Sequence, residues 1–318
     1  MKWRRAWLQA RATLARPRVL AAARRAPPGL FHVVVPPRVL DTYEETAQGI
    51  VDALRALGRQ GVVQCVSALA DVRPLRPGDR VLVYGAHRFL PWRPPAGVKL
   101  IGVNVEQYPE GWTPQGSAVE LMQKTDRFLA GCDVIVECNE CLLEESARLG
   151  RQAAGVLPFA YTARFDSGLS PLEQPPFDIA FLGRPGAGRR REALDRLARE
   201  FSLAPSTVAW GRSRGEFLRR ARIQLNLHQG EKPVLESHRF ALCLANGAFV
   251  LSEPLPSGAP FIAGIHYAQA PLADWPAAIR HWLTHPEARR RIADQGRQFL
   301  RTDYTFEHAL TRLLPALE

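Results

Sequence analysis

The sequence predicts an α/β protein with two domains, each built on a parallel β-sheet. Continuous apolar runs rich in β-branched residues alternate with amphipathic helical patterns, which is typical of parallel sheets covered by helices on both faces. The alternation stops between residues 156 and 178, where prolines occur without any periodicity, and then restarts. A chain of 318 residues is long enough for two domains of ordinary size.

The first domain is expected to alternate strands with helices. In the helix predicted at 42–58, Ile50, Val51 and Leu54 recur at helical spacing, and Gly58 is a suitable C-terminal stop. The expected strands are 31–37, 61–67, 80–87, 98–107 and 133–138, and the other expected helices are 116–131 and 139–150.

The second domain repeats this alternation and closes with helices. The expected strands are 177–183, 207–211, 222–228, 248–253 and 260–265, and the expected helices are 188–201, 215–221, 233–247, 272–285, 286–300 and 306–317. We therefore expect a basic tail at 1–28, domains at 29–160 and 161–302, and a terminal helix at 303–318.

The positive charge of the chain is concentrated at its N-terminus. The net charge is +11, and residues 1–40 hold nine Lys or Arg residues and no acid. The remaining residues hold 33 basic groups (42 minus 9) and 31 acidic groups, so the body is nearly neutral and no specific nucleic-acid partner is expected. The tail is interpreted first as a solvated extension. It could also be a basic helix on an anionic membrane surface or an arginine-rich targeting segment.

The cysteines indicate a reducing compartment. Five cysteines stand at scattered positions, which favours reduced thiols in a cytoplasmic protein. Association with a membrane through the tail is the alternative localisation. Cys138 and Cys141 form one CxxC pair, but zinc normally needs two such pairs, so no metal site is expected.

Two titratable residues follow strands of the first domain. His87 ends the strand predicted at 80–87, and Glu106 ends the one predicted at 98–107. Ligands of open parallel sheets bind outside the carboxyl ends of the strands, so these are the candidate catalytic residues. Glu106 could act as a general base toward a hydroxyl group, and His87 could transfer a proton. The alternative is an ordinary loop acid and an ordinary loop histidine.

A glycine-rich loop opens the second domain's first helix. Gly183, Gly186 and Gly188 have neither the dinucleotide-binding spacing nor that of a P-loop, but they could still let a diphosphate approach backbone N–H groups. Three arginines stand ready to neutralise such a group: Arg184, Arg189 and Arg190. The alternative is a flexible loop with a solvated basic patch.

The segment 222–253 carries further candidate ligands. His228 ends a predicted strand, and the helix at 233–247 is expected to place Glu236 and Arg239 on one face. Glu253 ends the next predicted strand. A helix N-terminus suits a pyrophosphate and a nearby carboxylate suits ribose hydroxyls. The alternative is a Glu236–Arg239 ion pair on a solvated face.

The second domain resembles the C-terminal domain of GT-B glycosyltransferases, in the branch of family 1-like proteins that includes the CgeB type. Arg239, Gly247 and the run 286–309 carry the resemblance, and one departure stands out: the family's glutamate five residues before the glycine is Leu242 here. The resemblance implies two Rossmann-like domains facing a central cleft. It also implies a nucleotide-sugar held by the second domain, an acceptor held by the first, no metal, and a last helix that returns to the first domain.

The function expected from these observations is a metal-independent transfer of sugar from a nucleotide-sugar, such as a UDP- or GDP-sugar, to an unidentified acceptor. The alternative, favoured by Leu242, is a non-catalytic GT-B relative that acts as a binding protein. An epimerase shares the fold but has no motif here, and the near-neutral body speaks against a DNA-modifying glycosyltransferase.

Overall fold

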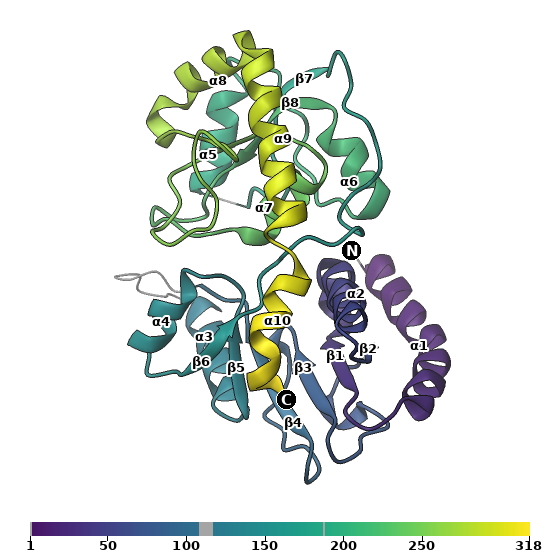
Figure 1. Cartoon of the computed structure of the whole chain (residues 1–318). Helices are drawn as coiled ribbons and strands as arrows, with labels where there is room; N and C mark the ends of the chain where they lie inside the picture. Colours follow the sequence, from purple (N-terminus) through teal and green to yellow (C-terminus); the bar gives the residue numbers. More distant parts are fainter. Residues whose placement is uncertain (1, 108–116, 187) are drawn as a thin grey trace. The chain divides into compact units, whose positions relative to one another are not determined.

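The computed structural model describes residues 2–107, 117–186 and 188–318. The chain divides into two compact units (Figure 1). Unit 1 comprises Met1–Pro158 and Phe306–Glu318, and unit 2 comprises Phe159–Thr305. The predicted cleft between two domains stays a prediction, and each unit is described by itself.

Unit 1 is built on a sheet of six parallel strands in the order β2-β1-β3-β4-β5-β6. The order reverses direction at β1, which has β2 on one side and β3 on the other, so the carboxyl ends of β1 and β3 flank the switch point. Three of the strands, β1, β3 and β4, are largely buried apolar runs, as predicted, whereas β6 was not anticipated from the sequence. The strands are β1 (Phe31–Val35), β2 (Gly61–Cys65), β3 (Arg80–Val83), β4 (Lys99–Asn104), β5 (Val134–Glu137) and β6 (Ala153–Val156).

The helices of unit 1 other than the N-terminal one follow the predicted amphipathic patterns. Helix α2 buries Ile50, Val51 and Leu54, and its chain turns out at Gly58, where φ is +72° and the N–H donates to the carbonyl of Arg55. The helices are α1 (Lys2–Arg25), α2 (Leu40–Ala56), α3 (Ser117–Leu129), α4 (Leu142–Arg148) and α10 (Phe306–Leu317), with 3₁₀ turns η1 (Pro37–Val39), η2 (Leu69–Asp71) and η3 (Ala86–Arg88).

The terminal helix α10 belongs to unit 1, although it follows unit 2 in the sequence. It packs on β6 and α2 (Figure 1). The backbone of Gly155 in β6 lies close to Leu313, because a Cβ atom at Gly155 would come within 2.9 Å of the leucine side chain. Because Gly155 has no side chain, α10 can approach the sheet closely at this point of β6.

Unit 2 is built on four parallel strands in the order β10-β9-β8-β7. The strand expected at 207–211 is reduced to a single bridge between Leu182 and Thr207. The prediction of a strand at 260–265 is wrong. The chain there includes Gly264 at φ +80°, and the strand that extends the sheet comes later, in β10. The strands are β7 (Phe177–Ala180), β8 (Ala221–Asn226), β9 (Val250–Ser252) and β10 (Ala268–Gln269).

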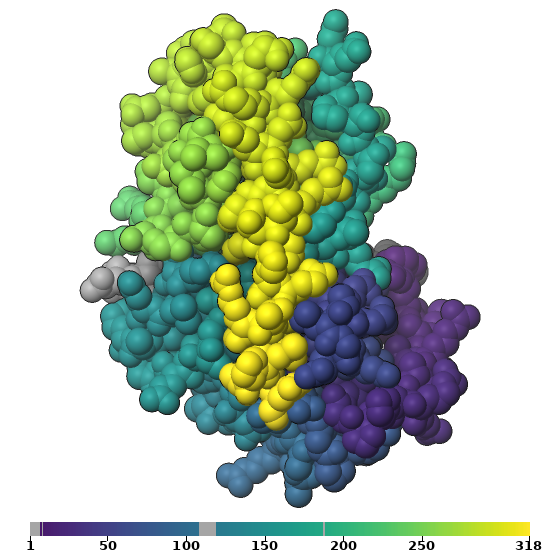
Figure 2. Space-filling view, in the orientation of Figure 1, coloured from purple at the N-terminus to yellow at the C-terminus, as the bar shows by residue number. Residues whose placement is uncertain are grey.

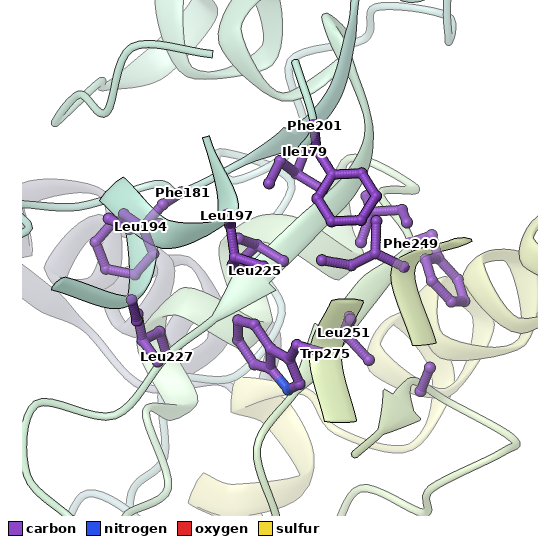
Figure 3. Packing of buried hydrophobic residues seen from close by; sticks show 14 of the residues in the cluster. Ile179, Phe181, Leu194, Leu197, Phe201, Leu225, Leu227, Phe249, Leu251 and Trp275 are labelled. Atoms are coloured by element: carbon purple, nitrogen blue, oxygen red, sulfur yellow. The ribbon is translucent and has the colours of Figure 1, made fainter. Parts of the chain in front are cut away.

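The core of unit 2 gathers around the buried indole of Trp275, whose Nε1–H donates to the carbonyl of Ala270 at 3.0 Å (Figure 3). Side chains from β7, β8 and β9, among them Ile179, Leu225 and Leu251, complete it (Figure 3). The surrounding helices are α5 (Arg189–Leu197), α6 (Gly211–Leu218), α7 (Ser237–Ala245), α8 (Trp275–Thr284) and α9 (Pro286–Thr302), and the 3₁₀ turn η4 (Leu272–Asp274) precedes α8.

The basic N-terminal segment differs from the solvated tail that we expected. It forms α1, and the chain at its end packs into unit 1 through Ala23, Ala26 and Leu30, against Val62 of β2. Among the described residues, no helix is both long and apolar enough to cross a membrane.

Candidate functional site

The candidate residues of unit 2 lie at one edge of its sheet. Gly183 follows β7, His228 follows β8 and Glu253 follows β9, and these strands are parallel neighbours. Their carboxyl ends therefore meet at the same edge, as the sequence predicted. Helices α5 and α7 both start near this edge, after the loops that leave β7 and β8.

Glu253 organises the first half of the edge. Its Oε2 accepts the backbone N–H of His228 at 2.7 Å and an N–H of Arg189 at 3.0 Å, and its Oε1 accepts a second N–H of the same guanidinium. Arg189 also donates to the carbonyl of His228 at 3.1 Å. This forked pairing raises the pKa of Arg189, so the guanidinium remains charged.

Glu236 organises the second half. It ends the loop before α7, one residue ahead of Ser237, so the helix begins later than predicted and Glu236 is not inside it. One carboxylate oxygen accepts from Arg190 and the other from Arg239. Both guanidinium groups are only 12% exposed, so the alternative of a simple ion pair on a solvated face is wrong.

The two arginines are held by more than this carboxylate. Arg190 donates to the carbonyl of Leu227 at 2.9 Å, and Arg239 donates to that of Leu182 at 3.0 Å. Both guanidinium groups also lie over the ring of Phe181, at 5.5 and 4.8 Å from its centroid. Burial and the neighbouring charge of Arg239 lower the pKa of Arg190, while Glu236 opposes the shift. The contacts therefore hold the positive charges of Arg190 and Arg239 in fixed positions.

Asn226 and Ser252 also belong to this edge, and neither was among the candidate ligands chosen from the sequence. Asn226 accepts from Arg239 at 2.7 Å and donates to the hydroxyl of Ser252 at 2.9 Å. Both side chains are buried. The signal that could have revealed them is a polar residue at the end of an otherwise apolar strand.

The two ring nitrogens of His228 have different surroundings. Its Nε2 lies 3.0 Å from the carbonyl of Pro254, which can only accept, so Nε2 carries the proton. Its Nδ1 is buried and has no hydrogen-bond partner among the described residues, and the whole residue is 2% exposed. His228 thus presents a buried ring nitrogen without a hydrogen-bond partner inside the edge.

The glycine loop contributes less than we expected. The N–H of Gly183 donates to the carbonyl of Thr207 at 2.7 Å and is occupied. Gly186 and Gly188 adopt positive φ angles with open space around them, and Gly188 is the residue before α5. Arg184 is exposed and has no partner among the described residues, so the structure does not bring it into the cluster.

Leu242 occupies the position of the family's glutamate and is 5% exposed within α7. No carboxylate stands at that point of the helix. The nearest carboxylate before it along the chain is Glu236, which precedes the helix.

The candidate residues of unit 1 lie together after two neighbouring strands. His87 sits in the 3₁₀ turn after β3, and Glu106 follows β4. Nδ1 of His87 lies 3.3 Å from Oε1 of Glu106. Burial lowers the pKa of His87 to about 4, with Arg88 adding to the shift, and burial raises the pKa of Glu106. Near pH 7 the histidine is neutral.

A buried polar network supports Glu106, and the sequence analysis did not identify it. Asn104 accepts the backbone N–H of Glu106 at 3.2 Å and donates to Oε2 of Glu137 at 2.8 Å. Ser146 donates to the other oxygen of Glu137. Because Asn104 and Glu137 are buried, the loop that carries Glu106 is tied to the sheet.

The CxxC pair has the features of ordinary reduced thiols. Burial raises the pKa of Cys138 and raises that of Cys141 to about 11, so neither is a thiolate near neutral pH. Within 2–107, 117–186 and 188–318, no group of three or more His, Cys, Asp or Glu residues could hold a metal ion.

Comparison with known proteins shows which proteins share this sequence pattern and this fold. A family described as "Glycosyl transferase-like" matches residues 189–315, which include all the clustered charges of unit 2. The fold as a whole matches solved glycosyltransferases. The chain has the GT-B fold. The resemblance drawn from the sequence is confirmed.

The similar GT-B structures share little sequence with this chain. HepE from Anabaena, solved with UDP and glucose, has a TM-score of 0.60 and 8% identity, covering 90% of this chain and 99% of its own. Sucrose-phosphate synthase from Thermosynechococcus elongatus has a TM-score of 0.58 and 10% identity, covering 91% and 100%. TarM has a TM-score of 0.56 and 9% identity over 76% of this chain, which spans 55% of TarM. The comparison with curated proteins gave no match.

Proposed function

We propose that this GT-B protein transfers a sugar from a nucleotide-sugar to an acceptor, with the nucleotide held by unit 2. The family match over 189–315 supports this, because it contains Arg189, Arg190, Glu236, Arg239 and Glu253. HepE, a structure of the same fold, was solved with UDP and glucose.

The observation that carries the proposal is the arginine cluster at the sheet edge of unit 2. Arg189, Arg190 and Arg239 face two carboxylates, Glu236 and Glu253, so the cluster has an excess positive charge. The first N–H groups of α5 and α7 have no acceptor within their helices. A diphosphate supplies the negative charge and the acceptor oxygens that such an edge lacks.

Glu236 is the better candidate for the ribose hydroxyls. Glu253 already accepts three hydrogen bonds, and its side chain is almost fully buried. Glu236 accepts from two arginines and is more exposed, so acceptor capacity remains on its carboxylate. Glu236 would then take over the role of the family's glutamate, whose position is occupied by Leu242 in this chain.

The reaction proposed needs charge stabilisation and a base. Loss of the nucleotide diphosphate builds up negative charge, which the preorganised arginines would stabilise without a metal ion. Glu106 would accept the proton of the acceptor hydroxyl, since burial raises its pKa toward the working range of a general base. The neutral His87, whose Nδ1 lies 3.3 Å from Oε1, adds no opposing charge beside this carboxylate.

The test is a thermal-shift panel of UDP, GDP, dTDP, CMP and their common sugars, followed by donor hydrolysis with the best ligand. A ligand at a hundred times its dissociation constant stabilises the fold by about 2.7 kcal/mol, which is a visible shift. A stabilising nucleotide whose sugar is released supports the proposal. A panel without any shift contradicts it.

One observation favours a second function, binding without turnover. Leu242 places a buried apolar side chain where the family has a carboxylate. A protein of this kind would bind the nucleotide in the panel and leave every donor sugar intact. Release of sugar from any donor would exclude this alternative.

A further inference from the structure

Helix α1 has one face that packs into unit 1 and another that remains uncovered. Ala23 is buried in unit 1 together with residues that follow the helix. Trp7 and Leu14 are seven residues apart and so lie on one face of the helix. They are 57% and 79% exposed. At about 100° per residue, Ala23 points away from this face, since it lies about 160° around the axis from Trp7.

Arginines continue the same stripe. Arg11, one turn after Trp7, lays its guanidinium over the indole at 4.9 Å and pairs with Glu44 at 3.0 Å. Arg18 lies one turn after Leu14, and Arg25 lies two turns after Arg18. Both are exposed without a partner among the described residues. We call Trp7, Leu14, Arg18 and Arg25 the outer face of α1; Arg11 borders this face and ties it to α2 through Glu44. Figure 2 shows purple atoms of α1 at the surface of the molecule.

The charged residues of α1 itself are all basic, and Glu44 of α2 is the acid that pairs with Arg11. Residues 1–40 contain no Asp or Glu. Glu44 neutralises Arg11, but Arg18, Arg24 and Arg25 remain unpaired among the described residues. A partner must therefore be negatively charged.

We propose that the outer face of α1 binds the surface of an anionic lipid bilayer. Trp7 and Leu14 would enter the boundary between headgroups and acyl chains, where an indole and an apolar side chain are both favourable. Arg18 and Arg25 would meet lipid phosphates. A nucleic acid would satisfy the arginines but offers a phosphate backbone, not an apolar layer, to an exposed leucine. The packing of Ala23 and Ala26 makes the helix part of unit 1, so the enzyme would be held at the membrane as a whole chain.

The test is co-sedimentation of the full chain with phosphatidylcholine vesicles, with and without phosphatidylserine. One variant, R18E/R25E, reverses two charges of the outer face, and a second, W7A/L14A, removes its apolar side chains. The matched control R290E/R291E makes the same charge change at two exposed positions of α9. All four residues changed to glutamate are exposed, so melting temperatures are expected to stay at the wild-type value.

We expect wild type and R290E/R291E to bind vesicles that contain phosphatidylserine, and to be released by high salt. R18E/R25E should bind at least about tenfold more weakly, because each arginine near an anionic surface contributes on the order of a factor of five. W7A/L14A should also bind more weakly. All variants should keep the nucleotide-induced thermal shift of the wild type, so this proposal can fail without the proposed function failing.

Three outcomes would overturn the proposal. The first is equal binding by R18E/R25E and R290E/R291E. The second is equal binding to vesicles with and without phosphatidylserine. The third is absence of vesicle binding, including the case in which the chain binds RNA or an acidic protein through the same arginines.

Discussion

At the scale of single residues, the proposed nucleotide-binding edge of the unit 2 sheet, the donor edge, depends on carboxylates that hold arginines in place. Glu236 keeps Arg190 and Arg239 on either side of one carboxylate. The sequence identified all three residues, because charged side chains after strands are conspicuous. It could not show that Glu236 precedes the helix, nor that Asn226 fixes Arg239, since both facts depend on side chains that only tertiary structure brings together.

Arg239→Lys should weaken binding of the nucleotide diphosphate about tenfold, because an ammonium group cannot replace the several directed contacts of the guanidinium. Calorimetric titration measures this. Arg291→Lys on α9, which is exposed, serves as the control and should bind as the wild type does. Equal affinities in the two variants would remove Arg239 from the site.

Glu106→Gln should lower the rate of sugar transfer or donor hydrolysis by about 10²–10⁴-fold, the usual contribution of a general base. Because burial raises the pKa of Glu106, the wild-type rate should rise with pH through a pKa above the ordinary value of a glutamate, and the variant should lack this limb. Nucleotide affinity should not change. Glu144→Gln, at an exposed position of α4, is the control; if it matched Glu106→Gln, the base assignment would be wrong.

At the scale of elements, the helices were more predictable than the short strands of unit 2. The spacing of Ile50, Val51 and Leu54 predicted α2 and its stop at Gly58 correctly. The apolar run 260–265 looked like a strand, but Gly264 turns the chain there and Ile262 and Ile265 are exposed. Helix α7 starts at Ser237 rather than near Pro233, and the backbone of Glu236 just before it is non-helical, with φ −81° and ψ 61°.

The first turn of α7 also predicts a pH dependence. The ring of His238 stacks on Phe159 at 4.6 Å, and burial, with the charges of Arg214 and Arg239, lowers its pKa to about 3. The unfolded chain therefore binds a proton that the folded chain does not, between about pH 6.5 and pH 3. Keeping His238 neutral costs nothing above about pH 6.5 and destabilises the folded chain increasingly as the pH falls toward 3.

His238→Phe keeps an aromatic ring at that position and removes the titration. Its thermal unfolding should depend less on pH between 7 and 4 than that of the wild type, whereas the exposed His281→Gln should retain the wild-type slope. If the slopes of all three proteins coincide, His238 is not buried in its neutral form.

At the scale of the whole molecule, the sequence predicted two parallel-sheet domains, and the two sheets and the GT-B fold confirm that class. What periodicity could not show is the position of α1, because its apolar residues are divided between two faces instead of forming one stripe. The return of α10 to unit 1 was implied by family resemblance and not by the residues of the helix, whose pattern predicts only that one face is buried.

Helix α10 should contribute to the stability of unit 1 across a long sequence separation. Leu313→Ala removes a buried side chain that packs beside Gly155, and it should lower the free energy of unfolding of unit 1 by about 2–5 kcal/mol. Urea unfolding followed by circular dichroism measures the loss. Arg312→Ala, exposed on the same helix, should change stability little. A loss of equal size in both variants would show that α10 does not pack through Leu313.

The most direct test of the donor edge is calorimetric titration of nucleoside diphosphates into the wild type, Arg190→Ala and the exposed-residue control Arg290→Ala. If the arginine cluster of unit 2 binds the diphosphate, one nucleotide should bind the wild type and the control equally, and Arg190→Ala at least about tenfold more weakly. Equal binding by Arg190→Ala, or no binding of any nucleotide to the wild type, would contradict the assignment of unit 2 as the donor site.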